Sequence, residues 1–208
     1  MIQTPQGNER YAAVQARLPA VSLGSAPGCL PIEYDPCGGS SRETHTMQDE
    51  ITAVLRLDAV EAAPLVLGLE LVVGGCSGRI VEVEAYRQDD PASHSFRGLT
   101  PRNAPMFLWG GHLYVYRSYG VHWCMNLVTG KEGDGQALLI RALEPLRGVA
   151  AMRRRRGEVS DLRLCSGPGN VCQALGVDGS LSGEPLGRRV RLCGHPGAAT
   201  AVLTTPRV

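Results

Sequence analysis

The alternation of residue types along residues 81–86 constrains the fold of this chain more than any other feature. Aliphatic positions alternate with carboxylate or aromatic positions, in the order Val81, Glu82, Val83, Glu84, Ala85 and Tyr86. Successive side chains of a β-strand point to opposite faces, so this pattern predicts a strand that packs its aliphatic face on a core. The opposite face, with two carboxylates and a ring, is either the solvated face of an antiparallel sheet or a general-base site.

Periodic segments elsewhere predict the rest of the fold. We expect helices at residues 46–57 and 58–67, the second capped by Asp58 and followed by Gly68. The remaining expected elements are strands at 69–73, 79–86, 113–117, 121–128 and 136–142, and helices at 147–156 and 170–176. Short strands interleaved with a few helices indicate an α+β fold and not a doubly wound parallel sheet.

Length and composition indicate one domain and a tail. A chain of 208 residues with 43% hydrophobic residues can bury one ordinary core. Residues 1–46 mix Pro, Gly, Ser and acidic residues without periodicity, which predicts a disordered acidic tail before a folded domain at 47–208. The absence of long apolar runs predicts no membrane helix and no signal peptide. Seven cysteines without metal-site spacing predict reduced thiols in a cytoplasmic, reducing compartment and no metal site.

The charge is unevenly distributed along the chain. Residues 1–78 carry four basic and nine acidic groups, whereas residues 79–208 carry seventeen basic and eleven acidic groups. The second part therefore has a net charge of +6, which favours a polyanionic partner. Lys131 is the single lysine among the 21 basic residues. Arginine suits phosphate contacts through its planar fork, although codon bias would give the same composition.

Aromatic residues are concentrated in one segment. Eight of the ten aromatic residues and three of the five histidines lie between residues 86 and 123. Tyr114 and Tyr116 would project to one side of a strand, either as a core pair or as part of a stacking site. Tyr119 follows at an expected hairpin tip, where a large ring is exposed unless it folds back onto the hairpin. This concentration suggests a site that stacks on a flat ligand.

Several motifs together resemble the alkyladenine (3-methyladenine) DNA glycosylase family. They run in order from about residue 60 to about residue 176 and cover more than half of the chain. In this sequence they are residues 79–86, 92–95, 100–103, 106–107, 111–116, 119–120, 124–126, 138–145 and 167–170. A match of this extent is far more specific than any single motif.

The resemblance implies a single α+β domain with a curved, mainly antiparallel sheet, flanking helices and a protruding β-hairpin. It implies a monofunctional, metal-independent and cofactor-free enzyme that removes alkylated or deaminated purines from damaged double-stranded DNA. The purines are of the 3-methyladenine, 7-methylguanine and hypoxanthine class. Such an enzyme would act as a cytoplasmic, nucleoid-associated monomer without a membrane partner.

The resemblance also implies residue roles. Glu84 would activate the attacking water and Arg141 would lie near that water. Tyr119 would enter the minor groove in place of the flipped nucleotide. The expected base-pocket residues are Tyr86, Ala92, His94, Tyr116 and Asn126. The expected DNA backbone contacts are Thr100, Arg102, Gly120 and His122.

The C-terminal part departs from the family pattern. Members of the family continue beyond a segment like residues 206–208 with a further strand, so we expect part of the pocket wall to be missing or replaced. One alternative is therefore an inactive lesion-binding module. A helix-hairpin-helix glycosylase or lyase, suggested by residues 167–169, is disfavoured by the absence of iron–sulfur cysteine spacing and by the single lysine.

Overall fold

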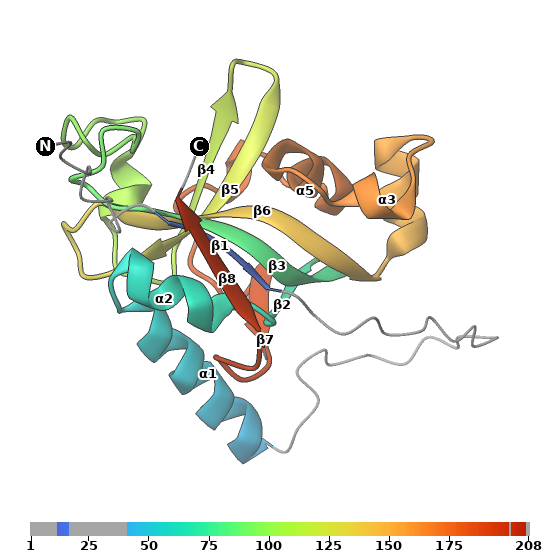
Figure 1. Cartoon of the computed structure of the whole chain (residues 1–208), viewed down its shortest axis with the longest axis horizontal. Coiled ribbons are helices and arrows are strands. Elements are labelled where there is room, and N and C mark those ends of the chain that lie inside the picture. Colours follow the sequence, from blue (N-terminus) through green and yellow to red (C-terminus); the bar gives the residue numbers. More distant parts are fainter. Residues whose placement is uncertain (1–11, 17–40, 200, 207–208) are drawn as a thin grey trace, which may run out of the picture.

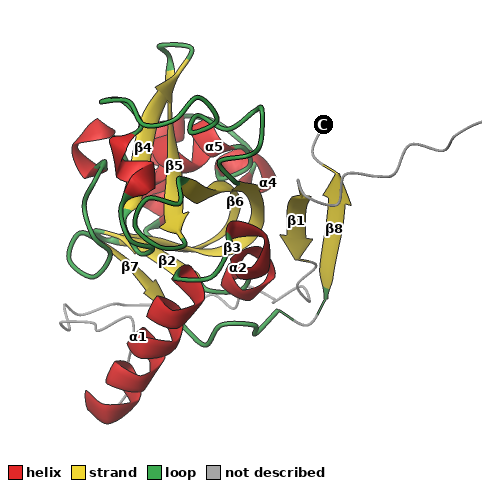
Figure 2. Cartoon of the chain, turned by 90° about the vertical axis from the view of Figure 1, so that its left-hand side faces the viewer, coloured by secondary structure: helices red, strands yellow, loops and turns green. Residues whose placement is uncertain are grey.

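A computed structural model describes residues 12–16, 41–199 and 201–206 as a curled antiparallel sheet with helices against it (Figures 1 and 2). The strand order is β4-β5-β6-β3-β1-β8, and β2 pairs with both β3 and β7. The strands are β1 (Ala12–Ala16), β2 (Glu70–Val73), β3 (Cys76–Tyr86), β4 (Leu113–Ser118), β5 (His122–Thr129), β6 (Gln136–Arg147), β7 (Val190–Cys193) and β8 (Val202–Pro206). The expected α+β domain with a mainly antiparallel sheet is confirmed.

Helices lie on two sides of this sheet, with α1 and α2 at one side and α3 and α5 at the other (Figure 1). The α-helices are α1 (Ser41–Leu55), α2 (Ala59–Val66), α3 (Val149–Arg156), α4 (Asp161–Leu164) and α5 (Pro168–Leu175). Two 3₁₀ turns, η1 (Ala104–Phe107) and η2 (Gly179–Leu181), complete the elements. Fully buried aliphatic side chains such as Ile51, Ile80 and Ile140 form the core between helices and sheet.

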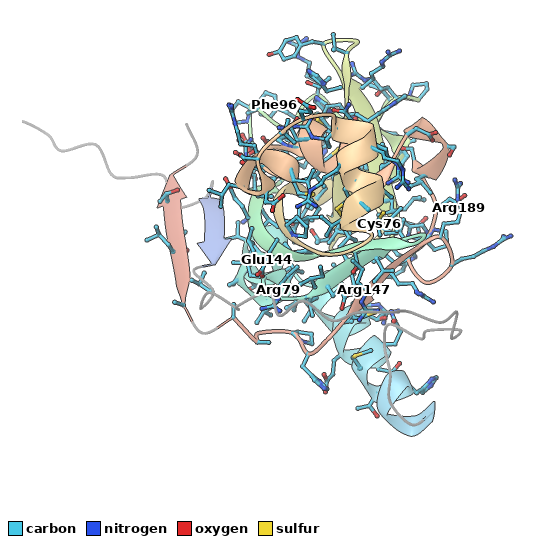
Figure 3. All side chains as sticks on the ribbon, turned by 90° about the vertical axis from the view of Figure 1, so that its right-hand side faces the viewer. Cys76, Arg79, Phe96, Glu144, Arg147 and Arg189 are labelled. Carbon is cyan, nitrogen blue, oxygen red and sulfur yellow. The ribbon has the colours of Figure 1, made fainter. Side chains whose placement is uncertain are left out.

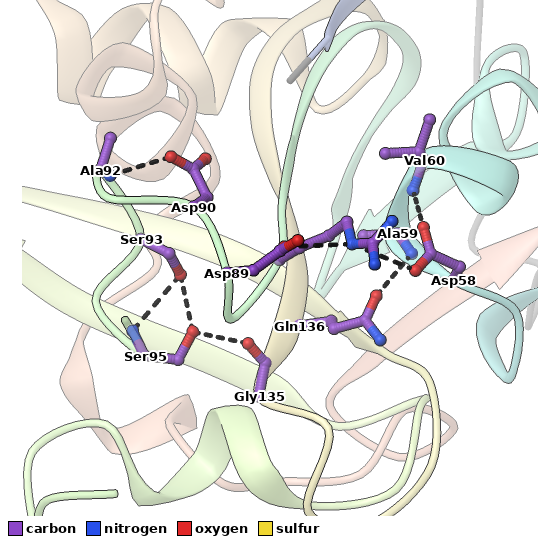
Figure 4. Close-up of polar contacts among 11 residues, drawn as sticks. Asp58, Ala59, Val60, Asp89, Asp90, Ala92, Ser93, Ser95, Gly135 and Gln136 are labelled. Carbon is purple, nitrogen blue, oxygen red and sulfur yellow. Dashed lines mark hydrogen bonds and ion pairs between the residues drawn. The ribbon is translucent and has the colours of Figure 1, made fainter. Parts of the chain in front are cut away.

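Helix α2 forms where the sequence predicts it. The Asp58 carboxylate accepts a 2.9 Å hydrogen bond from the Val60 N–H, as a capping residue does (Figure 4). The Ala59 N–H is satisfied by the side-chain carbonyl of Gln136 at 2.9 Å, which ties the helix start to β6. Gly68 follows with a φ of +89°, a conformation that favours glycine.

Several boundaries differ from the sequence expectation. Strand β3 begins at Cys76 and β6 continues to Arg147, because the two strands pair over almost their whole length. Helix α1 begins at Ser41, and Ala12–Ala16 form β1 within the segment that we expected to be a disordered tail. The other residues of that expected tail lie outside the described part of the chain. The short strands β7 and β8 escaped prediction because their glycine-rich surroundings hide any alternation.

The hairpin β4–β5 stands out from the body of the molecule, as expected (Figure 1). Its strands are in register from Leu113↔Leu127 to Ser118↔His122. Tyr119, Gly120 and Val121 form the tip between the paired residues Ser118 and His122. Tyr119 (φ +48°) and Gly120 (φ +70°) both lie in the left-handed region that primed hairpin turns require. Tyr119 is the only residue other than glycine with positive φ among the described residues.

The cysteines correct one expectation. Cys76, Cys124, Cys165 and Cys172 are free and buried, as reduced thiols would be. Cys193 is disulfide-bonded, so the expectation that all seven thiols are reduced is wrong for this residue. None of the helices in the described ranges has the length and apolar character needed to span a membrane.

Candidate active site

The carboxylate of Glu84 lies within a small polar cluster formed by β3 and β6. Arg141 Nη1 lies 3.2 Å from Glu84 Oε1, and Arg141 Nε lies 3.4 Å from Glu82 Oε1. The hydroxyl of Tyr86 donates a 2.9 Å hydrogen bond to Glu84 Oε2. Glu84 itself is buried, with 7% of its surface exposed. Each of its oxygens therefore has a defined donor beside it, which fixes the orientation of the carboxylate.

Register shifts between β3 and β6 direct the side chains of this polar cluster. The pairing of β3 with β6 changes register on both sides of Glu82, as a β-bulge does when it redirects side chains. Glu82 and Glu84 consequently both reach the guanidinium of Arg141 from the next strand. The carbonyl of Arg141 also accepts a 2.8 Å hydrogen bond from the N–H of Gly167, just before α5. Residues 167–169, which suggested a helix-hairpin-helix enzyme in the sequence, form the start of α5, and Gly167 anchors the strand that carries Arg141.

A narrow cavity of about 40 Å³ adjoins this cluster, and aromatic rings form most of its wall. Its lining residues are Tyr86, Ala92, His94, Met106, Tyr114, Tyr116 and Asn126. The rings of Tyr114 and Tyr116 stack with centroids 5.4 Å apart, and His94 meets Tyr116 edge-on at 4.4 Å. Such a wall offers flat faces to a planar ligand.

Hydrogen bonds fix the polar side chains that line this cavity. His94 Nδ1 lies 2.8 Å from the hydroxyl of Tyr114, and Asn126 Nδ2 donates to the Tyr114 carbonyl at 2.9 Å. Burial raises the pKa of Tyr114 to about 12 and also raises the pKa of Tyr116. Burial and then the positive charge of Arg102 lower the pKa of His94. Near neutral pH the rings are therefore uncharged, and the protonated phenol of Tyr114 can donate to His94.

The loop that carries His94 is fixed by buried polar contacts. Asn103 Nδ2 donates to the carbonyl of His94 at 2.8 Å and to that of Gly98 at 2.9 Å. The Ser95 hydroxyl donates to the carbonyl of Gly135 at 2.6 Å, and Asp90 accepts from the Ala92 N–H at 2.8 Å (Figure 4). The loop is thus tied to the strand that follows the hairpin, which gives His94 a defined position.

The expected DNA-contact residues lie on the surface next to the cavity. The side chain of Tyr119 is 99% exposed at the hairpin tip, and His122 lies across the hairpin from Ser118. Arg102 Nη2 approaches the carbonyl of Arg117 at 3.5 Å, which places the loop of Thr100 and Arg102 beside the hairpin. The guanidinium of Arg117 lies 5.6 Å from the Trp123 ring centroid and supports the hairpin stem.

The structure brings all five expected base-pocket residues to one cavity and joins Glu84 to Arg141 at its edge. Sequence reasoning missed two contributors and left a third open. Met106 lines the cavity although it belongs to a recognised motif. Tyr114, which the sequence allowed as either a core residue or part of a stacking site, lines the cavity as well. Asn103 fixes the His94 loop, and its position in the Thr-Pro-Arg-Asn motif was the available signal. Glu82 was placed on the correct face, but its pairing with Arg141 depends on the bulge, which no sequence pattern marks.

Comparison with family models matches residues 53–208 to the methylpurine-DNA glycosylase (MPG) model. The chain belongs to the methylpurine-DNA glycosylase family. A provisionally named 3-methyladenine DNA glycosylase of Agrobacterium fabrum is 50% identical over 151 residues, which are 73% of this chain and 77% of that protein. A similarly named protein of Granulibacter bethesdensis is 51% identical over 152 residues, 71% of this chain and 72% of that protein.

A third relative with the same provisional name, from Rhodopseudomonas palustris, is 56% identical over 126 residues. Those residues are 61% of each chain, so the match spans less than two thirds of that relative. The family resemblance read from the motifs is confirmed by these findings. This methylpurine-DNA glycosylase family member therefore belongs to the DNA glycosylases that remove alkylated bases in DNA repair.

Proposed function

We propose that this protein flips an alkylated or deaminated purine out of duplex DNA and hydrolyses its N-glycosidic bond, leaving an abasic site. One observation carries the proposal: Tyr86 lines the aromatic cavity with its ring while its hydroxyl holds Glu84. A base stacked in the cavity would therefore have its sugar bond beside an oriented carboxylate. Glu84 is the general base that takes a proton from the attacking water.

Charge and shape suit this substrate class. A purine methylated at N3 or N7 is cationic, and the electron-rich faces of Tyr86 and Tyr116 would hold it better than a neutral base by about 0.5–2 kcal/mol. The cationic base is also the better leaving group. Neutral hypoxanthine depends more on the site, and Asn126 at the cavity wall would exclude the exocyclic amino group of normal guanine.

Extrusion of the base leaves a gap in the duplex. Flipping a base costs a few kcal/mol, and a stacked aromatic ring returns about 1–3 kcal/mol of that. Tyr119 at the exposed hairpin tip would fill the gap, and Thr100, Arg102, Gly120 and His122 would contact the backbone around it. The proposal includes damaged duplex DNA as the partner, a monomeric enzyme, and a cytoplasmic location at the nucleoid.

The decisive experiment replaces Glu84 with Gln. Glu84→Gln keeps the shape of the side chain and its contact with Tyr86, so lesion binding should persist while single-turnover base release falls about 10²–10⁴-fold. Glu144→Gln is the matched control, because Glu144 pairs with Arg79 across the same two strands at 3.7 Å (Figure 3). A Glu84→Gln rate within about threefold of the parent would overturn the role. Lesion binding by a parent that releases no base would favour the lesion-binding module.

A second experiment tests the monofunctional mechanism. Lys131 lies in the turn after β5 and is not among the residues that line the cavity, so it is badly placed for a Schiff base. Borohydride should therefore trap no protein–DNA adduct, and excess EDTA should leave base release unchanged. A trapped adduct would assign the protein to the lyases, and inhibition by EDTA would require a metal.

A further inference from the structure

A second concave surface lies at the opposite end of β3 from Glu84. We call it the arginine groove: it is formed by the β2–β3 turn, the C-terminal end of α5 and residues 188–191, and it has a volume of about 410 Å³. Val72, Leu175 and Leu181 are among its apolar lining residues. Four arginines also line it, namely Arg155, Arg188, Arg189 and Arg191. Figure 3 shows this side of the molecule, with Arg189 and the nearby Cys76 labelled.

The four guanidinium groups differ in how they are held. Arg155 Nη1 donates to the Ala174 carbonyl at 2.7 Å, and Arg189 Nη1 pairs with Glu184 at 3.0 Å. For the side chains of Arg188 and Arg191 the structure gives no hydrogen bond or ion pair with another described residue, although the backbone of Arg191 pairs with β2. No acidic side chain is among the described residues that line the groove. The groove therefore combines two guanidinium groups that are held in place with two that have no such partner among the described residues, and only Arg189 is paired with a carboxylate.

This arrangement calls for an anion with several acceptor oxygens. Like charges that converge on one concave surface repel one another unless a counter-charge lies between them. The planar guanidinium fork matches phosphate oxygens in a two-point contact. We propose that the arginine groove binds the phosphate backbone of an undamaged DNA segment and so forms a second anchoring site, separate from the lesion pocket.

The separation follows from the length of β3. Cys76 opens the strand beside the groove and Glu84 lies eight residues along it. At about 3.3 Å per residue, roughly 25 Å of strand separates the groove end of β3 from Glu84. A DNA segment in the groove is therefore not the stretch that holds the flipped base. Phosphate binding is inferred from the residues of the groove alone, whereas the identification of the ligand as DNA rests on the proposed function.

The test compares two double variants that remove the same charge. Arg188→Gln with Arg191→Gln removes the two groove cations whose side chains have no hydrogen bond or ion pair with another described residue. Arg154→Gln with Arg163→Gln is the control, because both side chains are exposed and neither lines the groove. The groove variant should bind undamaged duplex about 10-fold more weakly, and its slope of log affinity against log salt should fall by about 0.9 for each phosphate lost. The control should change affinity less than about threefold.

Two further measurements separate the possible outcomes. Single-turnover base release at saturating enzyme should be the same in the groove variant and the parent. If the parent itself released no base, the proposed function would be contradicted, but phosphate binding in the groove would not be affected by that result. Inorganic diphosphate should raise the Tm of the parent and not that of the groove variant. If diphosphate raised the Tm of the parent alone while the groove variant bound DNA as tightly as the parent, the groove would still bind phosphate. Its ligand would then be a free phosphorylated molecule and not DNA. Equal weakening in both double variants, or no effect of either kind, would overturn the proposal.

Discussion

Tyr119 is the residue whose conformation and exposure agree least with a purely structural role. It takes a φ of +48° and leaves 99% of its side chain exposed at the hairpin tip. Residues other than glycine rarely adopt this backbone region, and a bulky ring gains nothing there from burial. The combination is understandable if the ring acquires its partner only when DNA binds.

Tyr119→Ala therefore separates function from stability. Substitutions at exposed positions usually change the free energy of unfolding by less than about 0.5 kcal/mol, so thermal melting should hardly change. Capture of duplex lesions should weaken, most for a well-paired lesion such as hypoxanthine opposite thymine and least for a mispaired lesion that flips cheaply. Melting curves and single-turnover excision on the two duplexes measure both effects.

The matched control for this prediction is Leu162→Ala. Leu162 is 92% exposed but lies in α4, away from the hairpin tip. It should change neither stability nor excision. If Tyr119→Ala lost the same excision rate on both duplexes, insertion of the Tyr119 ring would not be a source of selectivity. A destabilisation of about 3–5 kcal/mol by Tyr119→Ala would instead give the ring a role in the folded core.

His94 should make stability depend on pH in a defined direction. In the unfolded chain its imidazole protonates near 6.5, whereas burial and Arg102 lower its pKa in the folded protein. Above pH 6.5 both states hold the neutral ring, so the full stability is present. As the pH falls through 6.5 toward the lowered pKa, the unfolded chain binds the proton first and the folded protein loses stability.

His94→Gln removes this titration and also the contact with Tyr114. The variant should melt below the parent at pH 7.5, and the difference in Tm should shrink at pH 5. His122→Gln, at an exposed position of the hairpin, is the control and should leave the difference with the parent constant. A Tm difference between parent and His94→Gln that is the same at both pH values would show that His94 carries no such linkage.

At the scale of elements, local signals predicted the structure wherever one residue decides the boundary. Asp58 and Gly68 bracket α2 because a cap and a left-handed glycine act within their own turn. The extension of β6 to Arg147 was missed because it depends on pairing with β3, which lies about sixty residues earlier in the chain. The bulge that brings Glu82 to Arg141 was hidden for the same reason.

Gly110 marks a contact between elements that the sequence does not reveal. A Cβ atom added there would lie 1.9 Å from the carbonyl oxygen of Leu55 at the end of α1. The same carbonyl accepts a 3.0 Å hydrogen bond from the N–H of Gly130, whose own carbonyl accepts from the Gly110 N–H at 3.0 Å. Glycine is required at this position by the close approach of three backbone segments.

Gly110→Ala should consequently destabilise the protein by about 3 kcal/mol or more, since backbone cannot move aside as a flexible side chain would. Gly75→Ala is the control, because its added Cβ meets nothing within 4 Å and its φ is not positive. That variant should stay within about 1 kcal/mol of the parent. Chemical denaturation of both variants measures the difference, and equal free energies of unfolding would contradict the close contact.

At the scale of the whole molecule, β3, the strand that carries Glu84, is enclosed between the N-terminal strand β1 and the mid-chain strand β6, and β8 pairs with the outer edge of β1. Strand β1 pairs with β3 through Ala13↔Glu84 and with β8 through Val14↔Thr204. On the other side of β3, Leu139 of β6 pairs with Glu84. The motifs predicted the central strands, since those at 79–86, 124–126 and 138–145 each lie within a single strand. They could not predict β1, because its position is determined only by partners about seventy and 190 residues away.

This enclosure predicts a long-range effect of a change in β1. Because β1 lies between two strands, each of its N–H groups faces one of them, and proline at its centre removes one donor and disturbs the pairing. Val14→Pro should increase hydrogen exchange in β8, whose described strand partner is β1 alone. It should also slow base release about 10-fold or more, because Glu84 loses one of the two strands that fix its backbone. Val14→Ala keeps the N–H and should leave both measurements close to the parent. Unchanged exchange in β8 and an unchanged rate in Val14→Pro would mean that the N-terminal strand does not support the site.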